Sequence, residues 1–309
     1  MTALASSADH YQVPAAGTLN LDHVAHFVPR IDDASSALEK LGFTLTPFSE
    51  QSHRPEPDGP LVPGGTGNRC AMLQRGYLEF LTPTGDTPVA GQLRAAIGRY
   101  VGAHLIAFGT AGPEGDYARI EKAGFAPLPP VHLQREIDTE LGPQTASFTV
   151  VRVAPGTMAE GRIQFCRHHT PALLWQQRWL YHANRAVSLA GVILRVADAQ
   201  EAAKRYARYT GLPAQPSGAV WRLDTARGYL IFADRDALHR RLGVVAPTLP
   251  WIAGHILKSD DIAVTRDYLS KAGASLHDLG HHRLKVDLSP AVGGFLVFEH
   301  KASGDLRFD

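Results

Sequence analysis

Cysteine is scarce in this sequence of 309 residues, which contains only Cys70 and Cys166. Two distant cysteines cannot form a disulfide framework, and without CxxC spacing they give no strong signal for a zinc site. Such low cysteine usage is typical of a reducing compartment. We therefore expect the protein to be cytoplasmic.

Long hydrophobic runs and an excess of one charge are also missing. The formal net charge is +1, and lysines and arginines are interspersed with acids. No apolar run is long enough to cross a bilayer. These features exclude broad attraction to nucleic acid or to an anionic membrane, so we expect a small-molecule substrate. The oligomeric state stays open, with a homodimer among the options.

What the sequence does contain is a strand, a helix and a glycine stop that recur four times. The first copy begins with LDHVAHFV at residues 21–28, continues with Asp32 and Asp33 as expected helix caps, and stops at Gly42. Each copy closes with a short apolar strand, and these endings read GYLEFL, GRIQFC, GYLIFA and GGFLVF. The pattern predicts an α+β fold in which helices back a curved sheet whose other face can form a cavity.

Three breaks divide the chain into expected domains. Residues 1–18 lack a basic start and a sustained apolar stretch, so we expect a flexible leader rather than a signal peptide. Residues 171–187 contain an apolar helical stripe that predicts a linker between one half at 19–170 and another at 188–309. Within the first half, residues 47–67 are dense in proline and glycine and predict a long surface loop.

Histidine and carboxylate side chains occur at matching places in the first two copies. His23 and His104 begin strands, whereas Glu79 and Gln164 lie in the closing strands, 56 and 60 residues further on. A buried carboxylate inside the apolar GYLEFL needs a partner, because an unpaired charge in a core is costly. Together these four residues predict a metal site, for which zinc, nickel, cobalt, manganese and iron are all suitable ions.

Neighbouring side chains extend this candidate site. Period-two alternation places Cys166 and His168 on the same strand face as Gln164, and Tyr77 on the face of Glu79. We expect Tyr77 and Cys166 to bind substrate. Glu79 and His168 are the candidate catalytic residues, with His168 as the base.

The four copies resemble the βαβββ modules of the vicinal oxygen chelate superfamily, which includes glyoxalase I, bleomycin-resistance proteins and extradiol dioxygenases. The match to its glyoxalase-like branch is most specific in LDHVAHFV and NRCAMLQRGYLEFL. The resemblance implies four modules that pair into two cupped mixed-sheet domains. It also implies metal ligands from the first and last strands of the N-terminal pair, which are His23, Glu79, His104 and Gln164.

The later modules depart from this ligand pattern. The corresponding places hold Gly191 and Ile231 in the third copy, and Gly254 and Val297 in the fourth, and none of these side chains can bind a metal. His255 lies one residue out of register and should point to the other sheet face. The resemblance therefore implies a C-terminal module pair without metal ligands.

The leading functional hypothesis is a glyoxalase-like metalloenzyme, of isomerase or lyase type, whose divalent ion chelates vicinal oxygens of a small substrate. One alternative is an Fe(II) extradiol-type ring-cleaving dioxygenase, although that resemblance would place the metal in the third and fourth modules. The other alternative is a metal-free binding or resistance protein. The metal content of the purified protein distinguishes the metal-dependent enzymes from the metal-free binding protein.

Overall fold

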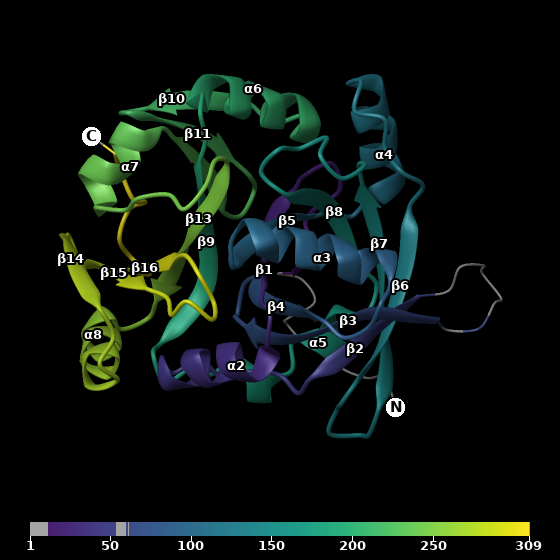
Figure 1. Ribbon diagram of the computed structural model, residues 1–309, viewed down its shortest axis with the longest axis horizontal. Coiled ribbons are helices and arrows are strands. Elements are labelled where there is room, and N and C mark those ends of the chain that lie inside the picture. The colour runs from purple at the N-terminus through teal and green to yellow at the C-terminus, as the bar shows by residue number, and fades with distance from the viewer. Residues whose placement is uncertain (1–11, 54–59, 61, 309) are drawn as a thin grey trace.

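The computed structural model describes residues 12–53, 60 and 62–308 (Figure 1). The first unit contains β1 (Asn20–Phe27), α2 (Ile31–Lys40), β2 (Ser49–His53), β3 (Val62–Met72) and β4 (Tyr77–Pro83). The second contains β5 (Gly102–Gly109), α4 (Pro113–Lys122), β6 (Val131–Ile137), β7 (Gln144–Arg152) and β8 (Arg162–His168).

The third unit contains β9 (Ala186–Arg195), α6 (Ala199–Thr210), β10 (Ala214–Ser217), β11 (Val220–Asp224) and β12 (Tyr229–Ala233). The fourth contains β13 (Trp251–Ser259), α8 (Ile262–Lys271), β14 (Leu276–Gly280), β15 (Arg283–Asp287) and β16 (Phe295–His300). Connecting helices are α3 (Pro88–Arg99), α5 (Pro171–Leu174), the 3-10 helix η1 (Gln177–Trp179) and α7 (Arg235–Leu242). The predicted α+β fold of four βαβββ modules is confirmed.

The strands of the first two modules close into a barrel. Their order is β1-β4-β3-β2-β6-β7-β8-β5, and β5 returns to pair antiparallel with β1. Closure also depends on a short contact between β2 and β6, where Ser52 lies opposite Gln134. The barrel thereby encloses side chains from both modules.

The last two modules form an open sheet in the order β14-β15-β16-β13-β9-β12-β11-β10. It joins the barrel where Ile252 of β13 lies opposite Ala103 of β5. Its inner face is filled near the end of the chain, because Leu306 and Phe308 are only 3% and 2% exposed and pack in one cluster with Tyr229.

One helix from each module covers the outer side of the sheet, as Figure 1 shows for α2, α4 and α6. These helices bury Leu38, Ile120, Tyr206 and Leu269 in one apolar cluster. The predicted caps Asp32 and Asp33 are wrong, because Arg30 is the N-cap of α2 and the two acids lie in its first turn. There their negative charges interact favourably with the positive end of the helix dipole.

The predicted loop at residues 47–67 is wrong in part, because β2 and the beginning of β3 lie within it. Pairing with neighbouring strands outweighs the turn preference of proline and glycine here. Gly67 serves a close approach rather than a turn, since a Cβ atom there would collide with the ring of Phe48. Residues 54–59 and 61 lie outside the described residues.

Of the predicted leader, residues 1–11 also lie outside the described residues. Gln12 is 2% exposed, and its side-chain amide donates a hydrogen bond to the Gln74 carbonyl at 2.6 Å. The predicted linker contains α5 and η1 instead of one longer helix. Among the described residues, no helix combines the length and apolar character needed to cross a membrane.

Candidate metal centre

The inner face of the barrel carries the polar residues from which a site can be built. Gln164, Cys166 and His168 alternate along β8 and share this face, as expected from a period of two. On β4, Tyr77 lies opposite His23 and Glu79 lies opposite Ala25 of β1. Helices α3 and α5 both pack on the barrel, and Leu93 and Trp175 join its interior cluster.

An irregularity in β1 brings Asp22 onto this face beside His23. The register with β5 shifts between Leu21 and His23, so that Asp22 is the extra residue of a bulge. Its Oδ2 atom accepts hydrogen bonds from His23 Nδ1 at 2.6 Å and from His168 Nε2 at 2.9 Å. Asp22, His23 and His168 form a buried group whose ligand atoms all lie within 4.8 Å, and it could hold a metal ion.

The carboxylate of Asp22 is fully buried, and its Oδ1 atom has no hydrogen-bond partner among the described residues. Burial alone would raise the pKa of Asp22, but the charges and hydrogen bonds of His168 and His23 outweigh burial and hold it well below its ordinary value. Asp22 therefore stays ionised. A buried anion in this place needs a cation, either an imidazolium or a metal ion.

Glu79 faces His23 from the neighbouring strand. Its Oε1 atom accepts hydrogen bonds from Asn68 and, at 3.5 Å, from Gln51. Its Oε2 atom lies 3.9 Å from His23 Nε2, beyond hydrogen-bond length. The amide of Asn68 is itself held by Arg135, which donates to it at 2.8 Å. One oxygen of Glu79 is thus fixed by amides, and the other is directed at an imidazole nitrogen.

His168 is surrounded by aromatic rings. Its ring centroid lies 5.0 Å from that of Trp175 and 5.2 Å from that of Phe148, and its Nδ1 atom has no partner among the described residues. The sulfur of Cys166 lies 4.0 Å from His168 Nε2. Burial raises the pKa of the Cys166 thiol well above its ordinary value, so the thiol stays protonated.

A cavity of about 70 Å³ brings most of the predicted site together. It is lined by His23, Tyr77, Glu79, Gln164 and Cys166, all of them predicted from the sequence. His168 contacts the site through Asp22 and does not line this cavity. Four further polar residues of the site were not predicted from the sequence: Asp22, Gln51, Asn68 and Arg135. The signal for Asp22 was available, because it is an acid inside an apolar strand, as Glu79 is.

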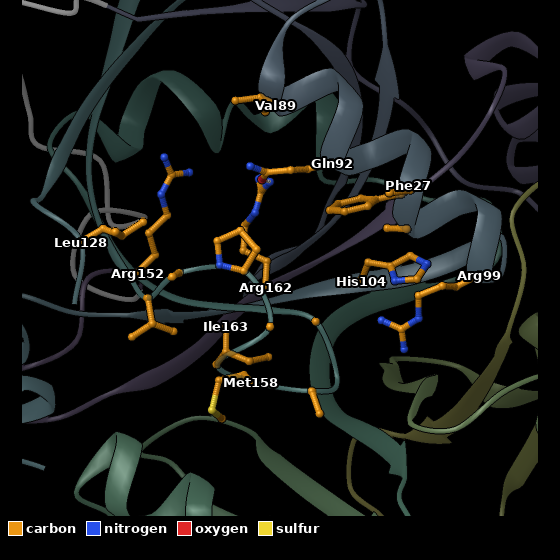
Figure 2. Close-up of a pocket in the computed structure, with 18 residues that line it drawn as sticks. Phe27, Val89, Gln92, Arg99, His104, Leu128, Arg152, Met158, Arg162 and Ile163 are labelled. Atoms are coloured by element: carbon orange, nitrogen blue, oxygen red, sulfur yellow. Dashed lines mark hydrogen bonds between the residues drawn. The ribbon is translucent and has the colours of Figure 1, made fainter. Parts of the chain in front are cut away.

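The structure does not bring His104 to this cavity. In the pairing of β5 with β1, Leu105 lies opposite Ala25 and Ala103 opposite His26, so His104 is the extra residue of a second bulge. Its Nε2 atom donates to the Tyr100 carbonyl at 2.8 Å, and burial lowers its pKa to about 4. His104 lines a separate cavity of about 320 Å³, which Figure 2 shows.

The corresponding places in the C-terminal sheet carry no ligand atoms. Gly191 lies opposite Tyr229, as His23 lies opposite Tyr77, and Ile231 takes the place of Glu79. In the fourth module Gly254 and Val297 lie in β13 and β16. His255 instead meets His26 of the barrel, with 2.6 Å between their Nε2 atoms.

Several solved structures share this fold at low sequence identity. A hypothetical protein from Staphylococcus aureus superposes with a TM-score of 0.62 at 12% identity, covering 91% of this chain and 99% of that one. A triple mutant of 4-hydroxymandelate synthase from Streptomyces coelicolor gives 0.57 at 14% identity, covering 94% and 95%. A fusion of a xylose isomerase-like TIM barrel with 4-hydroxyphenylpyruvate dioxygenase gives 0.58 at 10% identity, covering 95% and 51%.

At the level of sequence, no curated protein matches the chain. The profile of the glyoxalase-like domain family matches residues 21–210, which is more than half of the chain and includes all of the barrel strands except the first residue of β1. The chain therefore belongs to the glyoxalase-like domain family of the vicinal oxygen chelate superfamily.

Proposed function

We propose that the protein is a metal-dependent enzyme of isomerase or lyase type, which acts on a small molecule through two neighbouring oxygens. His23 Nε2, Glu79 and Gln164 hold the divalent ion inside the barrel. The observation that carries this proposal is the 2.6 Å hydrogen bond between Asp22 Oδ2 and His23 Nδ1. It fixes the imidazole so that Nε2 is directed at Glu79, and carboxylates commonly orient metal-binding histidines in this way.

The donor set fits a borderline divalent ion. An imidazole, a carboxylate and an amide oxygen suit zinc, nickel, cobalt, manganese or iron. Glu79 is the one anionic ligand, and the negative charge of Asp22 behind His23 is offset by the guanidinium of Arg135 beside Asn68. The centre therefore keeps a positive charge and favours an electron-rich, oxygen-bearing substrate. When bound, the ion supplies Lewis-acid stabilisation of charge that develops on the substrate oxygens.

The chain itself performs the positioning. Asn68 and Gln51 hold Oε1 of Glu79, so Oε2 is the carboxylate atom available to the ion. Tyr77 stacks on His23 with 4.4 Å between ring centroids, which restrains the imidazole. His168 acts on the centre through Asp22 and is therefore a positioning residue in this proposal rather than the base.

A second candidate function is Fe(II)-dependent oxygen chemistry. Asp22, His23 and His168 supply one carboxylate and two imidazoles, which is the donor composition of non-haem Fe(II) oxygenases. The fold is shared with 4-hydroxymandelate synthase, although at 14% identity. This alternative uses Asp22 and His168 as ligands, whereas the leading proposal uses Glu79 and Gln164.

Metal content of purified variants tests the proposal. Protein prepared without chelator should hold about one ion per chain by inductively coupled plasma mass spectrometry. Glu79→Gln should weaken metal binding by about 100-fold or more, while His168→Gln has a smaller effect. Exposed Glu121→Gln is the matched control.

If His168→Gln weakens metal binding more than Glu79→Gln does, the Fe(II) centre is favoured. Dioxygen uptake and loss of activity under an iron chelator would then support it. A wild-type protein that stays metal-free after supplementation would contradict both enzymatic proposals. In that case a metal-free binding protein is the remaining reading.

A further inference from the structure

A second cavity, of about 320 Å³, lies between α3 and the ends of β7 and β8 (Figure 2). Its walls include Phe27, Leu128, Met158 and Ile163, which make much of the surface apolar. Three arginines also line it, Arg99, Arg152 and Arg162, whereas none of the described aspartates and glutamates does. The cavity therefore combines apolar walls with positive charge.

Arg152 has no compensating partner in this cavity. Its side chain forms no hydrogen bond or ion pair with another described residue, and its buried Nε atom is unpartnered. Burial lowers the pKa of Arg152 because the charged guanidinium is poorly solvated there. A guanidinium in such surroundings favours the binding of an anion.

Arg162 adds a second positive charge nearby. Its guanidinium donates to Gln92 Oε1 at 3.1 Å, toward which Figure 2 shows it directed, and lies 5.8 Å from the ring centre of Phe27. Burial first, and then the charge of Arg152, lower the pKa of Arg162 to about 10. Two neighbouring guanidiniums repel each other, and an anion bound between or beside them offsets this repulsion.

His104 does not neutralise these arginines and does not add charge. The Tyr100 carbonyl can only accept, so His104 Nε2 carries a proton and Nδ1 remains an acceptor. Its pKa of about 4 keeps the ring neutral near pH 7. The charge of the cavity is therefore set by the arginines.

The arginine cavity lies along the same strands as the candidate metal centre. Arg162 is two residues before Gln164 on β8, and Arg152 lies opposite Gln164 on β7. Two residues along a strand span about 7 Å, which a small molecule can bridge. The two cavities share no lining residue among those described, so a ligand whose anionic group lies at the arginines would reach Glu79 only along this strand.

We propose that this cavity binds an oxyanion, a carboxylate or a phosphate, carried on an apolar body, with Arg152 and Arg162 as its donors. Planar guanidiniums match both oxyanions in charge and geometry. The assignment of this anion to the substrate, as the group that anchors it while its vicinal oxygens reach the metal centre, rests on the proposed function. The binding of an anion in this cavity does not depend on the proposed function.

Isothermal titration of the full-length protein with three related probes tests the proposal. Phenylacetate or phenyl phosphate should bind at least about tenfold more tightly than neutral phenylacetamide, and the tighter anion identifies the preferred group. Arg152→Gln and Arg162→Gln should each weaken anion binding by about tenfold or more. Arg162→Lys keeps the positive charge but loses the planar pair of guanidinium donors. Its affinity for the anions should lie between that of Arg162→Gln and that of the wild type.

Arg167→Gln is the matched control, because Arg167 lies on the same strand as Arg162 but in an odd position that alternates to the outer face. Thermal unfolding confirms that each variant is folded. Equal binding of all three probes, no binding of either anion, or unchanged affinity in both arginine variants would overturn the proposal. Glu79→Gln should still bind the anions, so a failure of the metal centre and a failure of the anion site give different results.

Discussion

The carboxylate of Asp22 accepts a hydrogen bond from His23 Nδ1 at 2.6 Å, between adjacent residues of one strand. Side chains of adjacent strand residues normally point to opposite faces, and the bulge at Asp22 is what allows this contact. The same oxygen reaches His168, 146 residues further along the chain. A local backbone irregularity thus connects the two modules of the barrel at the candidate centre.

Asp22→Asn should weaken metal binding by about 10- to 100-fold, because a neutral amide is a weaker acceptor for the Nδ1–H of His23 and orients the imidazole less firmly. The effect should be smaller than that of Glu79→Gln, since Asp22 acts through the imidazole. Competition with a chelating dye measures both affinities. Exposed Asp33→Asn is the control, and an unchanged affinity in Asp22→Asn would remove Asp22 from the centre.

The protein should lose stability as the pH falls from about 6.5 toward 4. His26 Nδ1 donates to the Val292 carbonyl at 2.9 Å, so His26 Nε2 accepts from His255 Nε2. Burial lowers the pKa of His26 to about 4 and that of His255 well below its ordinary value. Below pH 6.5 the unfolded chain therefore binds protons that the folded chain does not bind. His26 alone lowers the free energy of unfolding by about 3 kcal/mol once the pH is below its pKa in both the unfolded and the folded state.

Urea unfolding between pH 4.5 and 7.5 checks this dependence. The free energy of unfolding should rise with pH across this window, and His255→Gln should reduce the slope because one buried imidazole is removed. Exposed His281→Gln should leave the slope unchanged. An equal slope in His255→Gln and wild type would show that this pair does not govern the acid response.

The ion pair between Arg205 of α6 and Glu160 joins the two halves of the chain. Both carboxylate oxygens of Glu160, which is 1% exposed, accept from the guanidinium, at 2.9 and 2.8 Å. Arg205→Met should lower the free energy of unfolding by about 3 kcal/mol, because it leaves a buried carboxylate without a partner. The double variant Arg205→Met with Glu160→Gln should lower the free energy of unfolding by less than Arg205→Met alone. A larger decrease in the double variant would contradict this explanation.

The modules could be predicted because their signals are local. The four predicted glycine stops, Gly42, Gly124, Gly211 and Gly273, all adopt positive φ angles, between 71 and 84°. The apolar closing strands also lie where the repeat places them. Closure of the first sheet into a barrel could not be predicted, because it depends on pairing of β2 with β6, whose contact involves few residues.

The candidate site was predictable only as far as strict alternation holds. Alternation correctly groups Tyr77 with Glu79 and Gln164 with Cys166, which line one cavity. It fails at Asp22 and His104, because each is the extra residue of a bulge that no sequence signal marks. Gln51 and Asn68 were missed for another reason, since their strands come from a segment with loop-like composition.

The metal centre is tested most directly by a crystal structure of the protein loaded with cobalt, with anomalous diffraction measured at the metal edge. We expect one strong anomalous peak inside the barrel, bonded to His23 Nε2 and Glu79, with Asp22 still bound to His23 Nδ1. A peak bonded to Asp22 and His168 instead, or no peak in the barrel, would contradict this assignment.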